Sequence, residues 1–219
     1  MPQKFIDLSH TIESGMITYK GLPAPLVCDY LSRERSRELY EHGTEFQIGK
    51  IEMVANTGTY LDCPFHRYED GKDLAGLVLS QCADLAGIVV AVDYKHTRAI
   101  DAPFFEGLDI RGKAVLVHTG WSTHWRTDSY FENHPFLTED AAVWLRDHGA
   151  ALVGIDSHNI DDTRGRSRPV HSVLLKAGIL IVEHLCNLQA VTGRHFRFNA
   201  VPPKFKGVGT FPVRAYVVW

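Results

Sequence analysis

The chain has 219 residues, of which 45% are hydrophobic and 22% are charged, and its formal net charge is −3. This composition is typical of a globular protein with a sizeable core. The slightly acidic balance, without a basic block, argues against nucleic acid and against an anionic membrane surface as partners. The sequence has neither a signal-peptide core nor an apolar run of the roughly 18–20 residues that cross a bilayer, so we expect a cytoplasmic protein without a membrane partner.

The first informative segment is a strand-like run at residues 48–56, followed by a Gly-Thr turn. Pro64 prevents a simple continuation of a strand or helix, so we predict a kinked loop that displays Asp62 and His66. The two side chains can meet in one pocket, as a metal ligand and a general acid/base. An aspartate that caps the turn beside a surface histidine fits the same pattern.

Further along the chain, predicted strands alternate with predicted helices. The strands are five apolar, β-branched runs at residues 87–94, 113–120, 150–156, 178–185 and 213–219. Their near-continuous hydrophobicity indicates that both faces are covered. One helix is predicted to begin after Thr138 and to end at Gly149, and a second to run from about Val170 to Ala177. The Pro/Gly-rich stretch 199–215 is predicted to be an irregular loop.

The alternation of strands and helices predicts an α/β fold. No internal repeat, low-complexity tract or flexible linker divides the sequence, so we expect a single domain over residues 1–219. The sequence lacks a nucleophile elbow, a Walker loop, a dinucleotide-binding glycine fingerprint and an H-E-x-x-H zinc motif. None of the enzyme classes that carry those motifs is therefore indicated.

Two further places can carry chemistry. Glu183 lies in an apolar run that otherwise predicts a buried strand, and a buried carboxylate needs a partner or a metal. His171, at the start of the preceding helix, is a candidate to share its site, although an arginine paired with Glu183 at the strand end is an alternative. Asp156, His158 and Asp161 follow another strand end, where ligand groups gather in α/β sheets; capping explains any one of them as well.

The run at residues 56–66, NTGTYLDCPFH, follows the pattern H-x-G-T-H-x-D-x-P-x-H apart from two positions. Five further segments are informative: IDLSHTIESGM, VLVHTGW, LVGID, PVHSVLLKAGILIVEHLCNL and FPVRA. Over nearly its whole length, the sequence resembles the cyclase family of metal-dependent hydrolases. That family includes bacterial kynurenine formamidase-like enzymes and isatin hydrolase. The resemblance implies one α/β domain with a mixed sheet flanked by helices, hydrolysis of amide bonds, and association into a homodimer or homotetramer.

The resemblance also implies roles for four residues. In the two-metal members of the family, motif residues, a distant histidine and a distant glutamate hold two ions. Position by position, Asp62, His171 and Glu183 match the ligands of the second metal, and the step from His171 to Glu183 has the family's spacing. His66 matches the histidine that takes part in proton transfer.

Both histidines of the first metal are replaced here, by Asn56 and Tyr60. A tyrosine phenol is a poor zinc ligand at neutral pH because its ordinary pKa is about 10. An asparagine amide cannot supply a charge. The usual two-metal site therefore cannot be assembled in this chain.

Three hypotheses remain. In the first, the enzyme hydrolyses an amide, N-formyl or lactam-like C–N bond with one Zn²⁺ or Mn²⁺, which is held by Asp62, His171 and Glu183. His66 is then the general acid/base, and Tyr60 donates a hydrogen bond to the oxyanion. In the second, no metal is bound, and Tyr60 and His66 catalyse an acid/base reaction, as in a cyclase, dehydratase or isomerase. In the third, the chain is a non-catalytic small-molecule binder; four titratable groups kept in one place argue against it.

The substrate is expected to be a small molecule that carries an aromatic ring. Its predicted contacts are Asn56, Phe65, Trp121 and His158. Aromatic side chains suit such a ring. Ordinary core packing explains Phe65 and Trp121 about as well.

Overall fold

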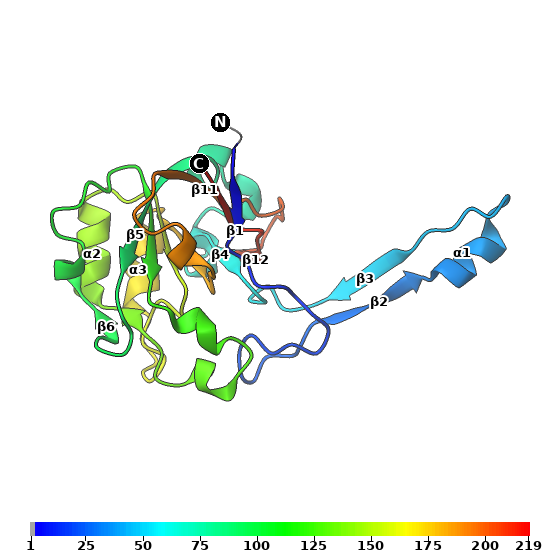
Figure 1. The fold of residues 1–219 in the computed structure, drawn as a ribbon, viewed down its shortest axis with the longest axis horizontal. Helices are drawn as coiled ribbons and strands as arrows, with labels where there is room; N and C mark the ends of the chain where they lie inside the picture. The colour runs from blue at the N-terminus through cyan, green and yellow to red at the C-terminus, as the bar shows by residue number, and fades with distance from the viewer. Residues whose placement is uncertain (1–2) are drawn as a thin grey trace.

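The computed structural model describes residues 3–219, which form a body built on a nine-stranded mixed sheet (Figure 1). The strands lie side by side in the order β1-β13-β11-β5-β7-β9-β10-β4-β12. Their bounds are β1 (Phe5–Asp7), β4 (Tyr60–Asp62), β5 (Leu85–Ala91), β7 (Ala114–His118), β9 (Leu152–Ile155), β10 (Leu180–Glu183), β11 (Phe196–Asn199), β12 (Thr210–Pro212) and β13 (Tyr216–Val218). The predicted α/β class with a mixed sheet is confirmed.

Smaller elements surround this sheet. Two pairs of short strands form separate ladders: β2 (Leu26–Leu31) with β3 (Ile48–Glu52), and β6 (Ala99–Ile100) with β8 (Phe136–Leu137). The α-helices are α1 (Arg33–Leu39), α2 (Glu139–Asp147) and α3 (Pro169–Lys176). The 3-10 helices are η1 (Pro64–His66), η2 (Leu74–Gly76), η3 (Leu79–Gln81), η4 (Ala102–Phe104), η5 (Trp121–His124), η6 (Asp128–Phe131) and η7 (Leu188–Ala190). Within residues 3–219, no helix has the length and apolar character that a membrane span requires.

Parallel strands make up the centre of the sheet. β5 pairs with β7, β7 with β9, and β9 with β10, all in parallel. Successive residues of β7 enter two different cores: Val115 and Val117 pack in the cluster that contains the buried faces of α2 and α3, and Ala114 and Leu116 in the other. This burial on both faces is the reason for the near-continuous apolar runs, and the four predicted central strands are confirmed.

Both predicted helices are confirmed, because their ends are encoded locally. The hydroxyl of Thr138 accepts a hydrogen bond from the backbone N–H of Ala141 at the start of α2, and Gly149 follows the helix with φ +77°. Pro169 occupies the first turn of α3, where its missing N–H costs nothing. The two helices pack against each other on one face of the sheet (Figure 1).

The sheet curls so that strands near its two ends share one core. Leu61 of β4 lies in the same cluster of buried side chains as Phe198 of β11 and Val217 of β13. The link between β12 and β13 is residues 213–215, so the chain passes within three residues from the β12 edge of the sheet to the strand beside β1. This curvature brings the C-terminal segment against the 56–66 segment.

Two predictions for these segments need correction. The loop predicted around residue 62 contains strand β4, and the stretch 199–215, predicted to be irregular, contains β12, which pairs with β4 in antiparallel orientation. Three residues are too few to show a hydrophobic period, so neither strand had a sequence signal. Pro212 is tolerated because β12 is the edge strand and needs no outward donor.

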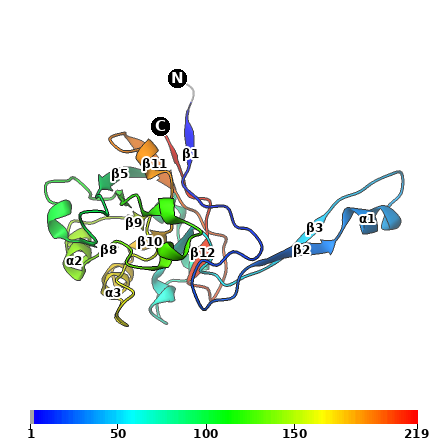
Figure 2. The same ribbon diagram turned by 60° about the horizontal axis from the view of Figure 1, so that its bottom comes forward.

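An arm projects from the body between residues 26 and 52 (Figures 1 and 2). It consists of β2, the short helix α1 and β3, so the strand predicted at residues 48–56 belongs to the arm and ends at Glu52. Several of its apolar side chains are largely exposed: Leu26, Val27, Tyr30, Leu39, Ile48 and Ile51. A two-stranded ladder with this much apolar exposure has little stability of its own.

Gly209, just before β12, provides a test of the close packing of β12 on η1. A Cβ at this position would lie 2.3 Å from the backbone N of His66 and 2.5 Å from its Cα. We expect Gly209→Ala to lower the free energy of unfolding by about 1–3 kcal/mol, the usual cost of overpacking, measured by urea denaturation. The control is Gly165→Ala, whose Cβ would meet only the Ser167 hydroxyl at 3.9 Å. Equal stability of Gly209→Ala and the wild type would contradict this packing.

Candidate active site

The three-residue strand β4 is the base of the candidate site. Tyr60 and Asp62 are two residues apart, so both side chains point to one side of the sheet while Leu61 enters the core. In the antiparallel pairings, Tyr60 lies opposite Glu183 of β10, and Asp62 lies opposite Thr210 of β12. Residues directly opposite each other hold their side chains side by side. The register of three strands therefore gathers four polar side chains.

Thr210 connects Asp62 with His66. Its hydroxyl donates to Oδ1 of Asp62 and lies 2.7 Å from Nδ1 of His66. Because the single hydroxyl hydrogen is used on the carboxylate, a neutral His66 carries its proton on Nδ1 and donates it to the threonine oxygen. Its Nε2 then keeps a lone pair for a proton or a metal. Thr210 was not predicted as a site residue because it lies in the stretch that was expected to be irregular.

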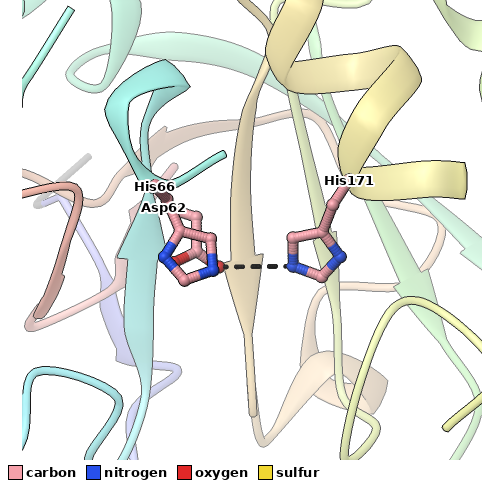
Figure 3. A group of neighbouring side chains, drawn as sticks. All are labelled: Asp62, His66 and His171. Carbon is pink, nitrogen blue, oxygen red and sulfur yellow. Dashed lines mark ion pairs between the residues drawn. The ribbon is translucent and has the colours of Figure 1, made fainter. Parts of the chain in front are cut away.

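His171 enters the site from the first turn of α3. Its Nδ1 lies 2.6 Å from Oδ2 of Asp161, whose carboxylate also accepts two backbone N–H groups of that turn. Asp161 thus caps α3 and orients the imidazole at once. On its other side, Nε2 of His171 lies 3.7 Å from Oδ2 of Asp62 and 3.8 Å from Oε1 of Glu183. Figure 3 shows the ring of His171 facing Asp62 and His66.

The surroundings of His171 favour a positive charge. Burial by itself lowers the pKa of this imidazole, but the hydrogen bond with Asp161 and the negative charges of Asp62 and Glu183 outweigh it and raise the pKa to about 10. Burial also raises the pKa of Glu183, against the opposing effect of His171. A position that holds a proton between two buried carboxylates suits a cation in general.

The donor atoms fit a divalent metal ion. One ligand atom from each of Asp62, His66 and His171 lies within 4.8 Å of the others. Oδ2 of Asp62 is buried and has no hydrogen-bond partner among residues 3–219, which is costly for a carboxylate. Carboxylate oxygens and imidazole nitrogens suit Zn²⁺ and Mn²⁺. The predicted set has Glu183 in place of His66, and the role of Glu183 as a ligand stays a prediction.

The phenol of Tyr60 is engaged by Glu183. Its OH donates to Oε2 of Glu183 at 2.5 Å, while Oε1 accepts the backbone N–H of Ile160 at 2.6 Å. Burial and the neighbouring charge of Glu183 raise the pKa of Tyr60 well above its usual value. Tyr60 is therefore a neutral hydrogen-bond donor. Its predicted role as a donor to an oxyanion stays a prediction.

Tyr19 is a part of the site that the sequence did not reveal. Its OH donates to the backbone carbonyl of His158 at 3.1 Å and accepts a hydrogen bond from the amide of Asn159. Burial, followed by the charge of Glu183, raises the pKa of Tyr19 well above its usual value. A single tyrosine in an irregular segment carries no local signal, so only the fold places it here.

A cavity of about 690 Å³ opens onto these groups. Tyr60, His66, His171 and Glu183 contribute to its wall, as does the half-buried Asn56. The structure therefore brings most of the predicted catalytic and metal-binding side chains to one space. Its size suits a small ring-bearing molecule.

Three residues predicted to contact the substrate lie elsewhere. Phe65 packs against the core, and Trp121 is buried with its indole N–H donating to the carbonyl of Tyr130. His158 is buried and packs against Tyr19, with ring centroids 4.4 Å apart. None of the three is part of the cavity wall formed by the described residues. Core packing, the alternative that the sequence left open for the two aromatics, accounts for their positions.

The sequence and the fold are similar to those of known proteins. The "Putative cyclase" family matches residues 6–162. A kynurenine formamidase of Bacillus cereus is 28% identical over 215 residues, which cover 98% of this chain and 97% of that protein. A solved structure of a potential metal-dependent hydrolase with cyclase activity is 27% identical, with a TM-score of 0.80 over 99% of this chain and 98% of that one. Isatin hydrolase A of Labrenzia aggregata shares the fold, with a TM-score of 0.84 at 18% identity over 99% of this chain and 93% of that one.

The family match spans well over half of the chain, and the similarity to the formamidase and to the hydrolase structure runs almost from end to end. The fold, the α/β class and the polar cluster on β4 agree with this similarity. The chain is an enzyme that belongs to the cyclase family of metal-dependent hydrolases.

Proposed function

We propose that this enzyme hydrolyses a C–N bond in a small amide, N-formyl or cyclic amide molecule, with one divalent metal ion. The observation that carries the proposal is the convergence of two buried carboxylates, Asp62 and Glu183, on Nε2 of His171. Two carboxylates and an imidazole form a ligand set that Zn²⁺ or Mn²⁺ accepts. Relatives named kynurenine formamidase and isatin hydrolase support an amide or a cyclic amide as the bond that is broken.

In this proposal Asp62, His171 and Glu183 hold the ion, and His66 moves the proton. When bound, a divalent cation supplies Lewis acidity toward the amide carbonyl. His66, held by Thr210 with its proton on Nδ1, offers Nε2 to take a proton from the attacking water and to return it to the leaving nitrogen. The water oxygen bonds to the carbonyl carbon, the C–N bond breaks, and the products are a carboxylate and an amine.

The structure disfavours a metal-independent reaction in which Tyr60 is the acid. The phenol of Tyr60 already donates to Glu183, and its raised pKa makes it a weaker acid than a free tyrosine. Its geometry suits a support for Glu183 better than a proton donor to substrate. Catalytic activity that survives a strong chelator and is lost in His66→Ala would favour the metal-independent alternative.

Metal content tests the proposal directly. Purified protein loaded with zinc or manganese and freed of excess is expected to retain about one ion per chain, measured by elemental mass spectrometry. Asp62→Ala removes a ligand and is expected to lose the ion. Glu139→Gln, which changes a carboxylate of the cavity wall outside the cluster, is expected to keep it. A wild-type protein that retains no ion after loading would contradict the metal-dependent mechanism.

His66→Ala separates proton transfer from metal binding. The variant is expected to retain the ion, while kcat for an N-formyl arylamine falls by about 10²–10⁴-fold, the usual contribution of a general acid/base. Metal content and kcat are measured on the same preparation. Loss of the ion in this variant would make His66 a ligand, as its distance from Asp62 and His171 also permits, and would overturn its assignment to proton transfer.

We also propose that the protein is a homodimer or homotetramer held by the arm, residues 26–52. Val27 and Ile51 lie opposite each other in the arm, with 44% and 62% of their surfaces exposed. An apolar cross-strand pair of this kind favours a covering surface.

Sedimentation equilibrium tests the role of the arm. The wild type is expected to associate, and Val27→Glu combined with Ile51→Glu is expected to dissociate it, because charges would have to be buried in the interface. Leu79→Glu, which charges an exposed apolar residue of the body, is the control and is expected to leave association unchanged. A monomeric wild type, or association that persists in the double variant, would contradict the proposal.

A further inference from the structure

Arginines contribute to the outer part of the cavity wall. Arg67, Arg166 and Arg168 all contribute to it, and Arg67 and Arg166 are exposed to solvent. Glu183, at the inner end, is buried. The outer wall formed by the described residues has one carboxylate, that of Glu139. The cavity is therefore positively charged near solvent and suited to a cation at its inner end.

The arginines of the loop 164–168 differ in how they are compensated. Arg164 forms an ion pair with Asp162, with 2.8 Å between Nη2 and Oδ2, and does not contribute to the described cavity wall. Arg168 donates to backbone carbonyls of its own loop, which leaves its positive charge in place. Arg166 has no ion-pair partner in the described part of the chain. Its guanidinium group is available to a ligand.

Arg67 lies beside the reactive histidines. It follows His66 in the chain, and its Nε donates to the hydroxyl of Ser172, which follows His171, at 3.2 Å. This hydrogen bond links η1 to α3 across one edge of the cavity. No carboxylate of residues 3–219 forms an ion pair with Arg67, so its remaining N–H groups are available to a ligand in the cavity.

We propose that the substrate is an anion: an amide that also carries a carboxylate, which Arg67 and Arg166 bind while the C–N bond lies at His66 and His171. The inference rests on the proposed hydrolysis and names its substrate class. A guanidinium group presents a planar fork of N–H donors that matches a carboxylate, and hydrogen bonds between charged groups are stronger than neutral ones. Uncompensated positive charge at the opening also raises the local concentration of anions. A neutral amide would need neither these guanidinium groups nor the positive charge at the opening.

The test compares 2-formamidobenzoate with its methyl ester, which have the same formamide and differ in one charge. For metal-loaded wild type, kcat/KM is expected to be at least about tenfold higher for the acid than for the ester, the effect of one charge-assisted hydrogen bond. Arg67→Gln combined with Arg166→Gln is expected to abolish this preference by raising KM for the acid. Arg164→Gln, in the same loop but paired with Asp162, is the control and is expected to keep the preference.

Salt provides a second measure, since KM for the acid is expected to rise with ionic strength while KM for the ester stays level. Equal kcat/KM for the two compounds in the wild type, or a preference that persists in the double variant, would overturn the inference. If neither compound is hydrolysed, the proposed function is at fault, and calorimetric titration with benzoate and benzamide then decides. Benzoate binding that depends on Arg67 and Arg166 supports the anion site, and equal binding of the two compounds contradicts it.

Discussion

The site depends on the backbone register of β4 between β10 and β12. Tyr60 meets Glu183, and Asp62 meets Thr210, because these residues are directly opposite in the two ladders. A slip of one residue would turn Leu61 toward the cavity and both polar side chains toward the core. Burying a carboxylate among apolar side chains is so costly that the register is well determined, although β4 has only three residues.

Most buried polar groups around β4 are hydrogen-bonded to one another. Asp161 uses its oxygens on α3 and His171, and Tyr60 uses its hydroxyl on Glu183. Oδ2 of Asp62 remains without a partner in the part of the chain that the structure covers. The cyclase motif has a histidine where this chain has Tyr60; a neutral phenol stabilises Glu183 without a second cation. The substitution is therefore compatible with an intact fold around the proposed site for one ion.

Charge changes along the depth of the cavity. At the inner end, His171 lies between the carboxylates of Asp62 and Glu183, which together stabilise a cation. Near solvent, Arg67 and Arg166 provide positive charge that no described carboxylate neutralises by an ion pair. With a divalent ion bound, the two inner carboxylates are neutralised, so an anionic ligand would meet attraction at the opening and no net repulsion inside.

The sequence by itself determined the features that local patterns encode. Helix α2 is predicted from its cap at Thr138 and its stop at Gly149, and the central strands from their apolar runs. Glu183 is recognisable as a buried acid because it lies within such a run. Tertiary structure alone decided the rest: the short strands β4 and β12, the place of Tyr19, and the hydrogen bond of Thr210 to Asp62, which are 148 residues apart. Contacts across such separations arise from sheet register and curvature, and a three-residue strand or a single polar side chain has no periodicity that could reveal them beforehand.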